Sequence, residues 1–77
     1  MPHVTIKHFP QDFTEQQQRQ LAAAITEVIT HHFGVTEGAV SVAVEPVEPA
    51  DWNDAVYGPE IAARQHLLIK RPDYGNN

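Results

Sequence analysis

The sequence predicts an α+β fold, in which a single βαβ unit is followed by a short C-terminal helix, all within one domain spanning residues 1–77. Residues 2–9 alternate apolar and polar side chains, the period of a half-buried strand. Residues 14–33 repeat apolar side chains at three- and four-residue spacing, as an amphipathic helix does. Residues 40–44 alternate β-branched with small side chains, which favours a second strand. A strand, a helix and a strand in this order form a parallel pair with a right-handed crossover, so the helix is expected to cover one sheet face.

The predicted helix carries both a start and a stop signal. Thr14 is followed three residues later by Gln17, a capping box in which each side chain satisfies a backbone N–H. Gly34 can adopt a positive φ without steric cost and therefore ends the helix. The apolar stripe between these signals consists of Leu21, Ala24, Ile25, Val28, Ile29 and Phe33.

The C-terminal part is expected to contain one more helix. Pro46 and Pro49 end the second strand because proline cannot donate to a ladder. Residues 50–58 are expected to be irregular, and Pro59 is expected to open the helix, because proline fits a first helical turn. This helix carries Ile61, Ala62, Leu67, Leu68 and Ile69, and Pro72 and Gly75 close it.

The short chain predicts association with a second copy. A domain of 77 residues buries only about 60% of the surface of its unfolded chain, so its own core is thin. The sequence has no cysteine, and therefore no disulfide compensates for the thin core. A partner subunit that completes the sheet is the expected source of the missing stability.

Charge and hydropathy exclude several classes of function. Ten acidic side chains against five scattered basic ones give a net charge of -5, which disfavours binding to nucleic acid. No apolar run approaches the roughly 20 residues of a membrane span, and no signal peptide is evident, so we expect a cytoplasmic protein without membrane contact. The five histidines lack a repeated ligand spacing, and adjacent His31 and His32 diverge by about 100° on a helix, so no metal is expected.

Pro2 is the residue that indicates a catalytic function. Removal of Met1 gives it a free secondary amine, and α-amino groups titrate near about 7.7 to 8.0, a pKa that partial burial lowers. Such a base suits removal of a proton from an enol hydroxyl, or from carbon beside a carbonyl, and its return at another carbon. The alternative is a Met-Pro start without catalytic meaning. The electrophilic partner stays unassigned among Arg64, Lys7 and a backbone N–H.

A whole-chain pattern adds to this interpretation. The residues that carry it are Pro2-His3, Lys7, Phe9-Pro10, Glu15-Gln16-Gln17, Leu21-Ala22-Ala23, Ile25-Thr26, Val28-Ile29, Trp52, Glu60-Ile61-Ala62, Leu68-Ile69-Lys70, Pro72 and Tyr74. In these, and over essentially all 77 residues, the chain resembles the 4-oxalocrotonate tautomerase superfamily. The resemblance implies a cofactor-free enol-keto tautomerase, an isomerase with Pro2 as proton acceptor that acts on enols such as phenylenolpyruvate. It also implies a cytoplasmic homodimer in place of the hexamer of shorter relatives.

Two departures from the family pattern bear on the substrate. The family holds a dicarboxylate with one arginine after the first strand and another in the second, where this chain has Asp12 and Ser41 nearby. Without these charge-assisted partners, a monoacid or aromatic enol is the better substrate. Trp52 matches an aromatic pocket residue of the family, which implies that it could pack over Pro2. The alternative, equally open from the sequence, is that Trp52 only fills the core of the domain.

Two rival functions remain at the level of sequence. In one, protonated Pro2 acts as an acid toward water addition to unsaturated acids, although the missing arginines weigh against it. In the other, the chain is a small dimeric binding or regulatory module of the same fold, because a fold does not by itself imply an activity.

Overall fold

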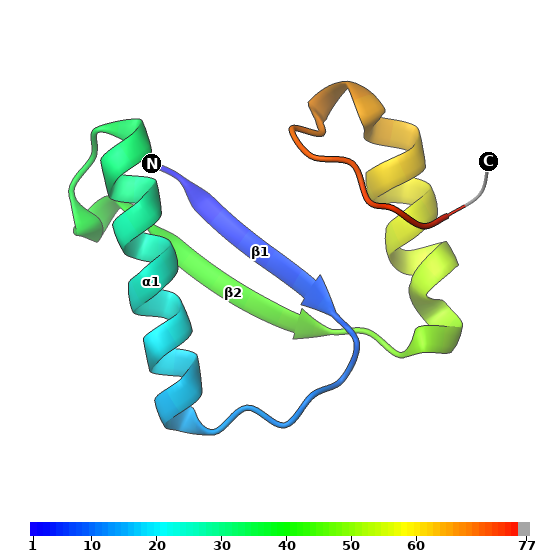
Figure 1. Ribbon diagram of the computed structural model, residues 1–77, viewed down its shortest axis with the longest axis horizontal. Coiled ribbons are helices and arrows are strands. Elements are labelled where there is room, and N and C mark those ends of the chain that lie inside the picture. The colour runs from blue at the N-terminus through cyan, green and yellow to red at the C-terminus, as the bar shows by residue number, and fades with distance from the viewer. Residues whose placement is uncertain (76–77) are drawn as a thin grey trace. The chain divides into compact units, whose positions relative to one another are not determined.

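The computed structural model describes residues 1–75, which form two compact units that divide after Pro46. The first unit contains, in order, the elements β1 (His3–His8), α1 (Glu15–Phe33), the 3₁₀ turn η1 (Glu37–Ala39) and β2 (Ser41–Pro46). Figure 1 shows α1 lying along the two strands, which run side by side. The second unit is helical throughout its first half and contains η2 (Pro49–Asp51), η3 (Asn53–Ile61) and η4 (Ala62–Leu67).

The predicted βαβ unit is confirmed. β1 and β2 form a two-stranded parallel sheet, with a register that runs from His3 opposite Ser41 to His8 opposite Pro46. The register sets Val4 beside Val42, and Val42 and Val44 line a cavity of about 170 Å³ together with side chains of α1. This face of the sheet therefore lies toward the helix, as the alternation of residues 2–9 predicts. The opposite face carries side chains that are exposed, among them His3, Thr5, Ser41 and Ala43.

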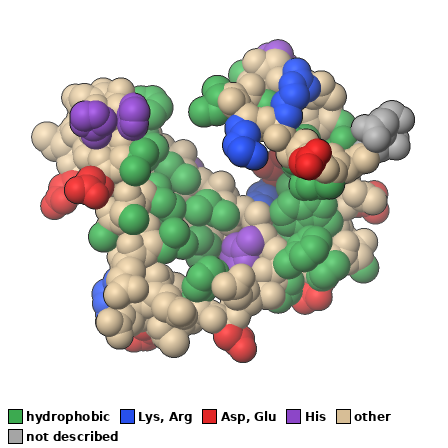
Figure 2. All heavy atoms as spheres, in the orientation of Figure 1, with side chains coloured by type: hydrophobic (Ala, Val, Ile, Leu, Met, Phe, Trp, Pro, Cys, Tyr) green, Lys and Arg blue, Asp and Glu red, His purple; other side chains and the backbone are tan. Residues whose placement is uncertain are grey.

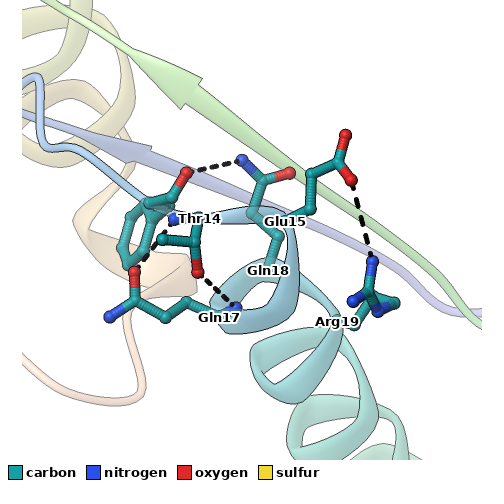
Figure 3. Close-up of polar contacts among 6 residues, drawn as sticks. Thr14, Glu15, Gln17, Gln18 and Arg19 are labelled. Atoms are coloured by element: carbon teal, nitrogen blue, oxygen red, sulfur yellow. Dashed lines mark hydrogen bonds and ion pairs between the residues drawn. The ribbon is translucent and has the colours of Figure 1, made fainter.

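Both predicted ends of α1 are confirmed by hydrogen bonds. The Gln17 N–H donates to Thr14 Oγ1 at 3.0 Å, and the Thr14 N–H donates to Gln17 Oε1 at 2.9 Å (Figure 3). Gly34 has a φ of 64°, and its N–H donates to the Thr30 carbonyl at 3.0 Å. The adjacent Glu15–Arg19 pair is 4.0 Å apart on exposed side chains and contributes little. Local signals thus fix where the helix begins and ends.

The capping box is expected to make a measurable contribution to stability. Thr14→Ala removes the acceptor for the Gln17 N–H, and the free energy of unfolding should fall by about 1 kcal/mol. Urea denaturation followed by circular dichroism measures the difference. Thr36→Ala is the matched control, because Thr36 precedes η1 without a side-chain capping bond and its replacement should cost less. An equal loss in both variants would contradict this role of Thr14.

The first unit has a half-buried interface between helix and sheet in place of a closed core. Among residues 1–75, the side chain of Val56 in the second unit is the buried apolar one, at 5% exposure. In the predicted stripe of α1, Leu21, Ile25 and Ile29 are half-buried, whereas Val28 and Phe33 are 55% and 65% exposed. Figure 2 shows apolar side chains reaching the surface beside α1 and over the strands. The stripe is therefore wider than two strands can cover.

The predicted start of the C-terminal helix at Pro59 is wrong. The helical segment begins at Pro49, which occupies the first turn, where the missing N–H of proline breaks no helical hydrogen bond. Pro59 lies inside η3, a π-helical segment whose wider turns accommodate an extra residue and hence the proline ring. Residues 50–58, predicted to be irregular, consequently lie in helical turns.

The predicted C-terminal extent of this helix is also too long. Arg64 has non-helical dihedral angles, and η4 ends at Leu67, so Leu68 and Ile69 lie beyond the helix. The Leu68 N–H donates to the Gln65 carbonyl at 3.1 Å and closes the last turn. Leu68 itself is extended, and Ile69 is 103% exposed. Short 3₁₀ runs have poor hydrogen-bond geometry, which explains why the apolar pattern does not extend the helix.

Candidate active site

Pro2 lies at the head of the parallel strand pair. Its carbonyl accepts a hydrogen bond from the Ser41 N–H at 3.2 Å, which continues the ladder by one residue before β1. The Pro2 side chain is half-buried, whereas Met1 is 99% exposed. A terminal residue without such a bond would be expected to fray. The sequence predicted a strand that starts at Pro2, and in the structure β1 starts one residue later, at His3, with Pro2 joined to the ladder through its carbonyl.

Three polar side chains on the exposed face of the sheet, close to Pro2 in the sequence or in the ladder, are connected by hydrogen bonds. His3 Nδ1 and Ser41 Oγ are 2.6 Å apart, and His3 Nε2 and Thr5 Oγ1 are 3.0 Å apart. Both ring nitrogens of His3 are therefore engaged by hydroxyl groups, and we call the three residues the hydroxyl-imidazole chain. Thr5 is two residues from His3 along β1, and Ser41 is its direct partner across the strand pair.

The hydrogen bonds of the hydroxyl-imidazole chain all run in the same direction from donor to acceptor. A neutral imidazole donates through one nitrogen and accepts through the other, so one hydroxyl of the chain donates to His3 and the other accepts from it. Sequence reasoning missed this cluster, although the parity of His3 and Thr5 puts them on one face. The cross-strand contact depends on a register that the sequence pattern alone does not fix.

Trp52 is held within the second unit by aromatic neighbours. Its Nε1–H donates to the Tyr74 hydroxyl at 3.1 Å, and the ring centroids of Tyr57 and Tyr74 are 5.9 Å apart. Gly75 has a φ of 109°, and a Cβ there would lie 2.5 Å from the Tyr57 ring, so only glycine fits beside it. Trp52 is half-buried, and its indole N–H has the partner that a buried tryptophan needs. The sequence singled out Trp52 but not its hydrogen bond to Tyr74.

The remaining sequence candidates lie apart from these groups along the chain. Asp12 is exposed in the segment between β1 and α1, and Arg64 is an exposed residue of η4. Lys7 is half-buried on β1, four residues from His3 and on the same face by parity. His31 and His32 stack edge to face with centroids 5.0 Å apart.

Metal clusters and membrane spans can be judged for the part of the chain that the structure describes. Within residues 1–75, no group of three histidine or acidic side chains is arranged to hold a metal ion. None of the helices in these residues combines the length and hydrophobicity needed to cross a membrane.

Comparison with known proteins identifies the family. A family model described as "Tautomerase enzyme" matches residues 2–64. The chain is 51% identical to Tautomerase PptA of Klebsiella pneumoniae (strain 342) over 74 residues, which are 96% of this chain and 97% of that protein. It is 42% identical to Tautomerase PptA of Escherichia coli (strain K12) over 77 residues, covering 100% and 99% of the two chains. Tautomerase PptA of Enterobacter sp. (strain 638) is 46% identical over 74 residues. The resemblance predicted from the sequence is confirmed, and the chain belongs to the Tautomerase family, whose members are isomerases that act on small molecules.

Proposed function

We propose that this tautomerase is a cytoplasmic, cofactor-free enol-keto isomerase in which the amine of Pro2, freed by removal of Met1, is the general base. Its substrates are small aromatic or monoacid enols such as phenylenolpyruvate. The observation that carries the proposal is the hydrogen bond from the Ser41 N–H to the Pro2 carbonyl, which holds the ring at a fixed strand end. The match to the family model, which begins at residue 2, supports the same assignment.

The proposed reaction moves one proton and no electrons. The unprotonated Pro2 nitrogen takes the proton from the enol hydroxyl, and the substrate becomes an enolate with charge shared between oxygen and carbon. The resulting ammonium returns the proton to carbon, which leaves a ketone and regenerates the amine. The exposure of Met1, at 99%, supports access of an aminopeptidase to the bond that must be cut.

The side chains of the exposed sheet face support a substrate of low charge. His3, Thr5 and Ser41 offer hydroxyl and imidazole hydrogen bonds on the exposed sheet face, and none of them is a guanidinium that could hold a carboxylate bidentately. Trp52 is proposed as an apolar wall of the substrate pocket. Its indole is oriented by the Tyr74 hydroxyl, which accepts the hydrogen bond of the indole N–H.

Ketonisation of phenylenolpyruvate, followed by its ultraviolet absorbance, tests the proposal. Protein whose intact mass lacks Met1 should accelerate the reaction, and a dicarboxylate enol should be converted more slowly at equal concentration. The second expectation follows from the absence of arginine at positions 12 and 41. No acceleration above buffer by protein verified to lack Met1 would overturn the proposed function.

A homodimer is the proposed working form, with all 77 residues acting as one tautomerase-like domain. Its support is the thin first unit, in which no described side chain is buried and both strands lie at a sheet edge. A surface groove of about 710 Å³ along α1, lined mainly by small side chains, adds room for a second chain. Light scattering at the concentration of the assay should give the mass of two chains, and the mass of one chain would contradict this architecture.

A further inference from the structure

We propose that Ser41 is a second catalytic residue, whose hydroxyl donates a hydrogen bond to the substrate oxygen, and that His3 is the positioning residue that aims this hydroxyl. The inference rests on the proposed function, because it assigns the electrophilic partner of Pro2 that the sequence leaves open. It is carried by two contacts of the same serine, one through its backbone and one through its side chain.

The position of Ser41 relative to Pro2 follows from the first contact. The Ser41 N–H donates to the Pro2 carbonyl at 3.2 Å, so the two residues are neighbours in the ladder. Adjacent strands lie about 4.8 Å apart, and a small enol or keto acid easily spans that distance. Ser41 is the register partner of His3, the residue directly after Pro2, so a small enol at the Pro2 nitrogen needs to extend only across this strand spacing to meet Ser41.

The orientation of the Ser41 hydroxyl follows from the second contact. In the tautomer with hydrogen on Nδ1, His3 donates to Ser41 Oγ at 2.6 Å, while the Thr5 hydroxyl donates to Nε2 at 3.0 Å. The lone pair of Ser41 that faces the ring is then occupied, and the hydroxyl hydrogen of Ser41 points elsewhere. All three side chains are exposed, so a ligand can approach that hydrogen from the open sheet face.

The chemical need for such a donor comes from the reaction. Negative charge grows on the substrate oxygen when the enol loses its proton, and a preorganised donor at that oxygen lowers the barrier. Protonated Pro2 cannot stabilise the oxygen while it delivers its proton to carbon. A neutral hydroxyl suits a monoacid or aromatic enol, because it adds no excess positive charge that would select a dicarboxylate.

Substitution of Ser41 gives the direct test. Ser41→Ala should lower kcat for phenylenolpyruvate by about 10²-fold with KM changed by less than about 3-fold, because the lost bond forms only as charge develops. Ser41→Thr keeps a hydroxyl on the same carbon and should recover most of that loss. Equal kcat in the wild type and in Ser41→Ala would overturn the inference, as would failure of Ser41→Thr to differ from Ser41→Ala.

A matched pair of variants separates positioning by His3 from a general structural role. The amide of His3→Asn reaches the place of Nδ1 and keeps a partner for Ser41, whereas the amide of His3→Gln reaches the place of Nε2 and keeps a partner for Thr5. We expect His3→Asn to stay within about 3-fold of the wild-type kcat and His3→Gln to fall by about 10-fold or more. Equal activity of the two variants would contradict the positioning role.

A measurement without substitution tests the same point. Nitrogen-15 NMR of imidazole-labelled wild-type protein reports which ring nitrogen of His3 carries hydrogen. The inference predicts hydrogen on Nδ1 when a substrate analogue is bound, and hydrogen on Nε2 would overturn it. Failure of the inference is distinguishable from failure of the proposed function. If the wild type is active and depends on Pro2 but the Ser41 and His3 variants keep its activity, only the inference is contradicted.

Discussion

Activity should fall to the uncatalysed rate when the nitrogen of Pro2 is part of an amide. Insertion of a glutamate between Met1 and Pro2 places a large residue after the methionine, so Met1 is retained and Pro2 becomes an internal residue. An amide nitrogen has no basic lone pair, and the loss of a general base alone costs about 10²- to 10⁴-fold. Phenylenolpyruvate ketonisation by protein of verified intact mass measures the loss.

The control for this insertion is the same residue appended to the C-terminus, which should leave the rate unchanged. Substantial activity in a chain that demonstrably retains Met1 would show that Pro2 is not the base. The hydrogen bond between the Ser41 N–H and the Pro2 carbonyl does not involve the nitrogen of Pro2, so the strand pair should survive the insertion. A loss of activity with unchanged circular dichroism therefore reports on chemistry.

Pro2→Ala should lower kcat/KM by at least about 10²-fold. The variant still exposes an α-amine after methionine removal, but this amine is primary and lacks the ring that the half-buried site holds in place. Some activity is expected to survive, in contrast to the inserted variant. The ratio of kcat/KM values between wild type and variant gives the lost transition-state stabilisation directly.

Pro10→Ala is the matched control for Pro2→Ala. Pro10 is exposed and follows β1, so its replacement changes the same side chain at the far end of the same strand. Its kcat/KM should stay at the wild-type level. If both variants kept wild-type activity, the base would have to be another group.

The first unit was largely predictable because its signals are local. Thr14 and Gln17 lie within one helical turn, and Gly34 marks the end of the helix by its own backbone freedom. The parallel pairing of the strands follows from their connection through a helix, whatever the exact side chains. What the sequence could not predict was how much of the helix stripe the sheet covers, since that depends on the number of strands beside it.

The second unit was predicted less accurately because two prolines could each occupy the first turn of its helix. Pro49 follows Glu48 and Pro59 follows Gly58, and either proline could open a helix, so the choice depends on whether a π turn accommodates the second ring. No local sequence pattern predicts a π turn. The contact between Trp52 and Tyr74 joins residues 22 positions apart and appears only once the segment after η4 folds back.

The candidate site likewise contains one residue that the sequence could predict and one cluster that it could not. Pro2 was predictable from its own chemistry, since no other residue type offers a secondary amine at a chain terminus. The hydroxyl-imidazole chain was not predictable, because a slip of one residue in the register of β1 and β2 would place His3 beside Val40 or Val42 instead of Ser41.

The parallel pairing also sets the order in which the chain can fold during synthesis. The two ends of the His3–Ser41 contact are 38 residues apart, so β1 leaves the ribosome well before its partner strand exists. At about 5 to 20 residues per second, translation of the intervening chain takes about 2 to 8 s. Throughout that interval the nascent N-terminus is an open, unstructured peptide, and processing enzymes can reach it before the ladder closes around the second residue.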